Sequence, residues 1–182
     1  MKQIFILIIA VAGTLLLAIM MRDQGAPLVT CNTPKGILNL EFAATPTAAS
    51  SVVSEWQTSR CNDGRTLVAT AIANTKLDFV FIAFYVLFFY MTSLILGQSL
   101  SGPAGKLGLW LRWGSVLAGL LDVAENLFMF NTLRGNITEM GTYATTLCAK
   151  IKFGLLAVCL LYLLLGLAWL LFNKRAKLLA QG

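Results

Sequence analysis

The chain contains 182 residues, of which 58% are hydrophobic and 12% charged, against roughly 45–50% and about 25% in soluble domains, which predicts a single membrane domain over residues 1–182. The absence of histidine excludes His-rich metal sites, His-ligated haem and His-activated nucleophiles, and we expect neither metal nor cofactor. The net charge of +6 comes from scattered basic residues without an aromatic strip, which indicates a charge bias across a membrane and no nucleic-acid binding.

Four apolar runs are long enough to cross a bilayer, for which a helix needs about 20 mostly apolar residues. They predict an all-α integral membrane protein, a four-helix antiparallel bundle with an extracytoplasmic cap made of a loop and a short helix. The spanning helices are expected at residues 4–21, 77–97, 107–130 and 150–172. The first run lacks small residues at its end, which favours a retained anchor over a cleaved signal peptide.

The first connection, residues 22–76, is too long for an inert linker in a small protein. Thr45 and Pro46 predict the start of a short helix, since threonine is a common N-cap and proline suits the first helical position. Apolar residues continue at helical spacing to Trp56. Residues 65–75 contain no helix breaker, so we expect them to continue into the second spanning helix. The connection is interpreted as a cap, with a partner-docking surface or a lid over a ligand site as alternatives.

Two of the four cysteines, Cys31 and Cys61, lie in this long connection. In an extracytoplasmic loop a disulfide can form and persist, so we predict a Cys31–Cys61 bridge, with two free thiols as the alternative. Cys148 and Cys159 are expected to be small packing residues.

Charged residues predict the orientation of the chain in the membrane. With both termini in the cytoplasm, basic residues lie on the cytoplasmic side and no acidic residue does. These basic residues are Lys2, Lys106, Arg112, Lys174, Arg175 and Lys177. Because cytoplasmic segments are enriched in Lys and Arg, we predict a multi-pass protein of the cytoplasmic (plasma) membrane, N-in and C-in, with the long first loop extracytoplasmic.

Polar residues interrupt the third apolar run. Asp122, Glu125 and Asn126 share one face of a helix because their spacing is i, i+3, i+4. Such groups are costly in hydrocarbon unless they meet a partner or a cavity. Neighbouring helices place further polar residues at the same height, and we expect all of them to converge. These further residues are Asp78 and Tyr85 on the second helix and Lys150 and Lys152 on the fourth.

This polar cluster is compatible with four roles. In the first, Asp122 or Glu125 pairs with Lys152, and Asn126 forms a hydrogen bond with a backbone carbonyl or a side chain. Such polar contacts orient helices in the membrane and stabilise their packing by about 1 kcal/mol each. The others are a pocket for a lipid headgroup or small amphiphile, a catalytic site with one carboxylate as general base, and proton or ion translocation.

Among these roles, the sequence favours a non-catalytic binding or assembly component. Its expected partners are membrane lipids and another membrane protein. The alternative is a small membrane enzyme that acts on a lipid or other amphiphile through Asp122 and Glu125.

Two motifs resemble those of a family of small bacterial four-helix membrane proteins without an established activity. They are an acidic residue, Asp78, at the start of the second helix, and Asp122-x-x-Glu125-Asn126 in the third. The stretch from Leu40 to Ala43, followed by a short helix ending near Trp56, is similar as well. The resemblance covers most of the chain and implies the same architecture and the same candidate residues, but no activity.

Overall fold

The computed structural model describes the backbone of residues 1–61 and 64–179 and the side chains of residues 1–61 and 64–172. The basic residues Lys174, Arg175 and Lys177, which enter the orientation argument, lie outside the described side chains. The protein is all-α, as predicted. Its elements are α1 (Lys2–Gly25), the short 3-10 helix η1 (Ala26–Leu28), α2 (Leu38–Glu41), α3 (Pro46–Thr58), α4 (Leu67–Ser99), α5 (Gly102–Leu133) and α6 (Glu139–Leu179).

Four of these helices, α1, α4, α5 and α6, are long and apolar enough to span a membrane by their length and composition. The chain is therefore a multi-pass membrane protein on those grounds. With 33 and 32 residues, α4 and α5 are each about 50 Å long, whereas the hydrocarbon core of a bilayer is about 30 Å thick. Both helices must therefore extend beyond the hydrocarbon.

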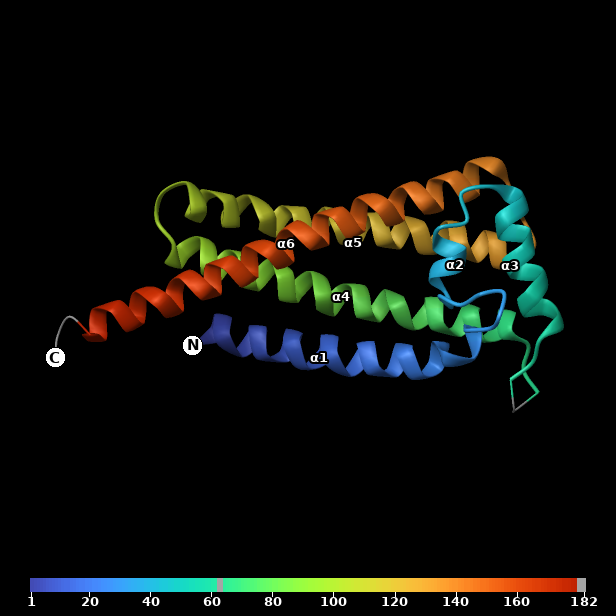
Figure 1. Ribbon diagram of the computed structural model, residues 1–182, viewed down its shortest axis with the longest axis horizontal. Helices are drawn as coiled ribbons and strands as arrows, with labels where there is room; N and C mark the ends of the chain where they lie inside the picture. The colour runs from blue at the N-terminus through green and yellow to red at the C-terminus, as the bar shows by residue number, and fades with distance from the viewer. Residues whose placement is uncertain (62–63, 180–182) are drawn as a thin grey trace.

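The spanning helices form an open series rather than a closed ring (Figure 1). Helix α4 packs against α1 on one side and α5 on the other, and α6 packs mainly on α5, with a smaller contact to α4. Helix α1 contacts chiefly α4. The N-terminus and the far end of α6 lie at one end of the molecule, which we call the terminal end. Helices α2 and α3 cover the opposite end, which we call the cap end.

All four spanning helices begin earlier than predicted, α1 at Lys2 and α5 at Gly102, and a threonine caps each of the two largest extensions, those of α4 and α6. Helix α4 starts at Leu67 rather than at residue 77, with the hydroxyl of Thr66 as its N-cap acceptor. The expected continuation of residues 65–75 into this helix is therefore confirmed from Leu67 onward. Helix α6 starts at Glu139 rather than at residue 150, and the Thr138 hydroxyl accepts a backbone N–H in its first turn.

Helices α4 and α5 approach each other very closely near their short connection at the terminal end. A Cβ atom added at Gly108 would lie 2.8 Å from the carbonyl oxygen of Ser93 on α4 and would collide with the hydroxyl of Tyr162 on α6. Real Cβ atoms essentially never show contacts below 3.0 Å. Only glycine therefore permits this three-helix contact.

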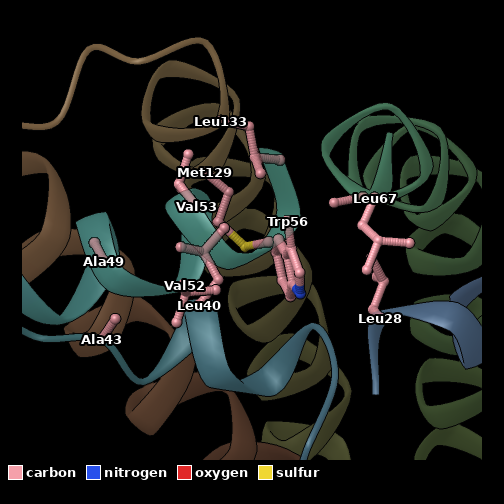
Figure 2. Packing of buried hydrophobic residues seen from close by; sticks show 11 residues of the cluster. Leu28, Leu40, Ala43, Ala49, Val52, Val53, Trp56, Leu67, Met129 and Leu133 are labelled. Atoms are coloured by element: carbon pink, nitrogen blue, oxygen red, sulfur yellow. The ribbon is translucent and has the colours of Figure 1, made fainter. Parts of the chain in front are cut away.

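The cap has its own apolar core, centred on the fully buried Trp56 (Figure 2). Helix α3 starts as predicted, with Thr45 as N-cap and Pro46 in the first turn. The Trp56 indole N–H donates to the Thr33 hydroxyl at 3.2 Å. Other members of this core come from the cap and from α4 and α5: Leu28, Leu40, Ala43, Ala49, Val52, Val53, Leu67, Ala71, Met129 and Leu133. The cap is thus packed onto the bundle.

The predicted Cys31–Cys61 disulfide is wrong, because both thiols are free. Cys31 is exposed, whereas Cys61 is half-buried and its sulfur lies 3.2 Å from the Thr70 hydroxyl at the start of α4. The apolar core around Trp56 holds the loop in place without a covalent link. Sequence reasoning underestimated this core because its members are scattered over several elements.

Candidate functional site

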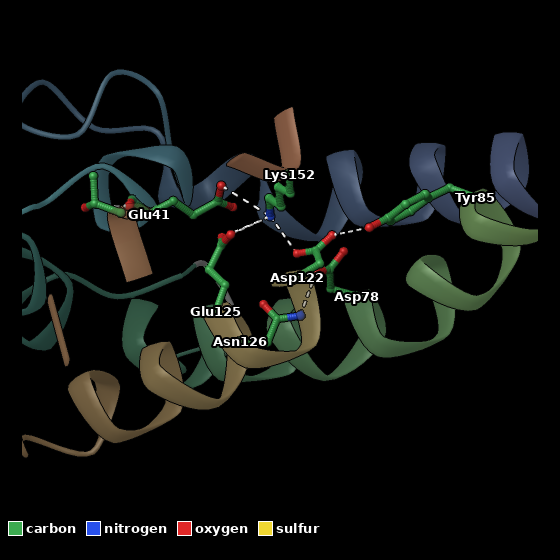
Figure 3. Close-up of polar contacts among 8 residues, drawn as sticks. Glu41, Asp78, Tyr85, Asp122, Glu125, Asn126 and Lys152 are labelled. Carbon is green, nitrogen blue, oxygen red and sulfur yellow. Dashed lines mark hydrogen bonds and ion pairs between the residues drawn. The ribbon is translucent and has the colours of Figure 1, made fainter. Parts of the chain in front are cut away.

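The polar residues of α5 are buried on one face of the helix, as their spacing predicts. Asp122, Glu125 and Asn126 are all buried, and on α4 Tyr85 is buried while Asp78 is half-buried. These groups lie toward the cap end, where α4, α5, α6 and α2 meet (Figure 3).

The ammonium group of Lys152 on α6 lies at the centre of three carboxylates (Figure 3). Its Nζ donates to Asp122 Oδ1 at 2.5 Å and to Glu125 Oε1 at 3.0 Å. The second oxygen of Glu125, Oε2, lies 2.9 Å from Nζ without a hydrogen bond. Glu41 Oε2 is 3.8 Å away. We call these four residues the Lys152 cluster; the expected pairing to Lys152 is made by both acidic residues of α5.

Glu41, the last residue of α2, was not among the predicted site residues. The Thr146 hydroxyl on α6 donates to the Glu41 backbone carbonyl at 3.0 Å, and the ring of Phe42 stacks on Phe153, which holds α2 against α6. Burial raises the pKa of the Glu41 carboxyl above its ordinary value, and the nearby Lys152 ammonium only partly offsets this effect. A lone carboxylate between the apolar Leu40 and Phe42 is the sequence signal that could have identified it.

Two further hydrogen bonds connect α4 to α5. The Tyr85 hydroxyl donates to Asp122 Oδ2 at 2.8 Å, on the side of Asp122 opposite Lys152 (Figure 3). The Asn126 amide donates to Asp78 Oδ2 at 2.7 Å, so Asn126 bonds a side chain and not a backbone carbonyl.

The prediction that Lys150 belongs to this site is wrong. Lys150 is exposed, and none of the described residues forms an ion pair with it. Residues two positions apart on a helix point in different directions, so the buried position of Lys152 directs Lys150 away from the cluster.

A cavity of about 420 Å³ adjoins the Lys152 cluster, and we call it the cap-end cavity. Residues from all four spanning helices and from the cap line it. Its polar lining includes Glu41, Asn74, Asp78, Tyr85, Asp122, Asn126 and Lys152, and its apolar lining includes Met21, Phe81, Phe88, Phe89, Phe153 and Leu156. Glu125 does not line the cavity. The lining therefore combines three carboxyl groups and other polar side chains with aromatic and aliphatic ones.

Hydrogen bonds leave two carboxyl groups in this cavity with spare acceptor capacity. Both oxygens of Asp122 accept hydrogen bonds, one from Lys152 and one from Tyr85. Asp78 accepts a hydrogen bond through one oxygen, from Asn126. The Oε2 atom of Glu41 is buried without a hydrogen-bond partner. Carboxyl groups outnumber the single ammonium. The arrangement therefore suits a ligand that supplies hydrogen-bond donors.

Comparison with known proteins gives no relative: no protein-family model, curated protein or solved structure matches the chain. Among residues 1–61 and 64–172, no group of three or more His, Cys, Asp or Glu side chains is arranged to hold a metal ion. Function must therefore be argued from the geometry of the site.

Proposed function

We propose that the protein is a non-catalytic membrane-embedded binding component that holds the polar head of a lipid-like amphiphile in the cap-end cavity. The observation that carries this proposal is the mixed lining, in which carboxyl groups and other polar side chains occur together with aromatic and aliphatic side chains. An amphiphile has both kinds of surface. A volume of about 420 Å³ also falls within the usual range of ligand pockets, about 300–1,000 Å³.

The contacts of the carboxylates favour binding over catalysis. A general base must reach the proton that it removes, yet Glu125 is fully buried outside the cavity wall. Asp122 lines the cavity, but Lys152 and Tyr85 occupy its oxygens. In this proposal the Lys152 cluster stabilises the helices around the cavity, and the surrounding lipids supply the ligand.

The orientation we propose is N-in and C-in, with the cap outside. The excess of basic residues at the terminal end supports it. The exposed Trp110, Trp113 and Trp169 lie toward that same end, as expected for residues at a membrane–water interface. The cap-end cavity would then receive its ligand from the outer leaflet.

The test is photo-crosslinking in mild detergent with a dodecyl amphiphile that carries a diazirine next to its head group. We expect crosslinks on the peptides that line the cap-end cavity. Thr14 lines the cavity from α1, so Thr14→Trp should fill it and reduce crosslinking several-fold. Leu16→Trp is the matched control, because Leu16 is exposed on the same helix and does not line the cavity.

Unchanged crosslinking of the cavity peptides in Thr14→Trp, with a wild-type melting temperature, would refute the proposal. If Thr14→Trp does not fold, Leu156→Trp fills the cavity from α6 and decides the question.

A further inference from the structure

We propose that the head group held in the cap-end cavity is a protonated amine, a cation that carries N–H donors. This inference rests on the proposed amphiphile site and names the chemistry of its ligand. It comes from three features of the cavity: the buried carboxyl group of Glu41, the balance of charges, and the aromatic side chains in the lining.

The first feature is a buried acceptor without a donor. Glu41 is only 8% exposed, it lines the cavity, and its Oε2 has no hydrogen-bond partner. The nearest cation, Lys152 Nζ, is 3.8 Å away, which is beyond hydrogen-bond distance. A buried acceptor that lacks a donor is unfavourable, and a ligand N–H would supply the missing donor.

The second feature is the excess of carboxyl groups. Glu41, Asp78 and Asp122 line the cavity, and among the described residues Lys152 is the only cationic side chain in its lining. Glu125, which does not line the cavity, contacts that same ammonium. The Lys152 ammonium already donates to Asp122 and Glu125. A cationic head group would be attracted by the carboxyl groups of Glu41 and Asp78, to which the Lys152 ammonium does not donate, whereas an anionic head group would add to the repulsion.

The third feature is the presence of three phenylalanine side chains of α4, Phe81, Phe88 and Phe89, in the lining. Aromatic faces attract cations, and desolvation strengthens this attraction. The same preference is already visible in the structure, where the Lys152 ammonium lies 5.0 Å from the centroid of the Phe153 ring. The aliphatic lining, made of Met21, Ile37, Met129 and Leu156, suits a hydrocarbon chain, so the amine belongs to an amphiphile rather than to a free soluble amine.

The experiment is competition against the photoactivatable amphiphile at neutral pH. The competitors are dodecylammonium, dodecyltrimethylammonium, dodecyl sulfate and a neutral dodecyl maltoside, with ethylammonium as the amine that lacks a chain. We expect dodecylammonium to compete at about tenfold lower concentration than the sulfate or the maltoside, as one charge-assisted hydrogen bond would give. The trimethylammonium, which has no N–H, should be intermediate, and ethylammonium weak.

Variants test whether the two free carboxyl groups cause this preference. In Glu41→Gln and in Asp78→Asn, the advantage of dodecylammonium over the maltoside should fall several-fold, while competition by the maltoside stays unchanged. Glu139→Gln removes one carboxylate at an exposed site at the start of α6, outside the cavity, and should keep the wild-type ranking.

The two proposals fail in different ways. If the cavity peptides of the wild-type protein are not crosslinked at all, the proposed amphiphile site itself is wrong. If they are crosslinked and the maltoside or the sulfate competes as well as dodecylammonium, only the amine is wrong. A preference for ammonium that persists unchanged in both carboxyl variants also overturns the amine proposal, as does ethylammonium competing as strongly as dodecylammonium.

Discussion

Lys152 is the residue on which the polar interior depends. It is 5% exposed, and its ammonium contacts carboxylates from α5 and α2. Replacing a buried ion pair by apolar residues can be neutral, but removing only one partner is strongly destabilising because the other charge stays buried and unpaired. Without Lys152, the carboxyl groups of Glu41, Asp122 and Glu125 would remain in the cluster without their common ammonium partner.

We therefore expect Lys152→Met to reduce the stability of the protein by roughly 3–5 kcal/mol, the range for breaking a buried pair. Thermal unfolding in mild detergent measures the effect. Lys150→Met is the matched control, since Lys150 is exposed on the same helix, and its effect should stay within about 0.5 kcal/mol. Equal melting temperatures for the two variants would contradict a stabilising role for the cluster.

A second expectation concerns pH and Glu41. Burial raises its pKa above 4.5, with Asp122 adding to the rise and Lys152 opposing it. The folded protein then holds this proton more tightly than the unfolded chain, so the contribution of Glu41 to stability decreases as the pH rises above 4.5. Glu41→Gln cannot ionise. Its melting temperature relative to wild type should therefore increase as the pH rises above 4.5.

Melting curves at several pH values check this expectation, with Glu139→Gln as a control for an exposed carboxylate. A difference between Glu41→Gln and wild type that does not change with pH, or that changes in the opposite direction, would show that Glu41 ionises normally in the folded protein.

The residues of the site were predictable where they lie on the spanning helices, since Asp78, Tyr85 and Lys152 meet the residues of α5 as expected. Asp122, Glu125 and Asn126 follow from one spacing on α5. Lys152 and Lys150 both precede the apolar run of the fourth helix, and only the rotation of α6 decides which one is buried. Glu41 comes from a different element, α2, and its position depends on packing that no local pattern encodes.

At the scale of elements, α5 makes a very close contact with both α4 and α6 at Gly108. Small residues let helices approach closely in membranes, where dispersion forces and hydrogen bonds replace the hydrophobic effect between helices. Because the obstructing atoms include the backbone of Ser93 and Gly97, a side chain at residue 108 cannot be accommodated by a rotamer change alone.

Gly108→Ala should accordingly destabilise the protein by about 1–3 kcal/mol, the usual cost of overpacking. Gly114→Ala on the same helix is the control, because a Cβ there would meet no atom within 4 Å. The control should be neutral or slightly stabilising, since alanine favours helix over glycine. Thermal unfolding of both variants measures the difference, and similar values would show that the contact can relax.

The spanning helices were the most predictable elements, since length and hydropathy suffice to detect them. The ends of these helices were less predictable. Thr66 and Thr138 act as caps beyond the predicted spans, and polar residues between each cap and its span, such as Asn74 and Lys76 in α4, interrupt the hydropathy signal. The prediction of a disulfide was wrong for another reason. Two cysteines in one loop share a compartment, but this does not place their sulfur atoms close together.

At the scale of the whole molecule, free and exposed Cys31 tests the orientation without any engineered site. In the N-in, C-in arrangement the cap is extracytoplasmic, so a membrane-impermeant maleimide should label Cys31 in intact cells. Cys31→Ser should lose most of this label. Labelling that occurs only after the cells are permeabilised would reverse the orientation.

The burial of the four tryptophans has an optical consequence. Trp56 is fully buried in the cap core, whereas Trp110, Trp113 and Trp169 are 76%, 56% and 61% exposed along the spanning helices. Bromine atoms on lipid chains quench indole emission at short range, so in brominated bilayers the fluorescence that survives should come chiefly from Trp56. The native protein therefore separates two signals, one that follows melting of the cap and one that follows contact between the helices and the lipid.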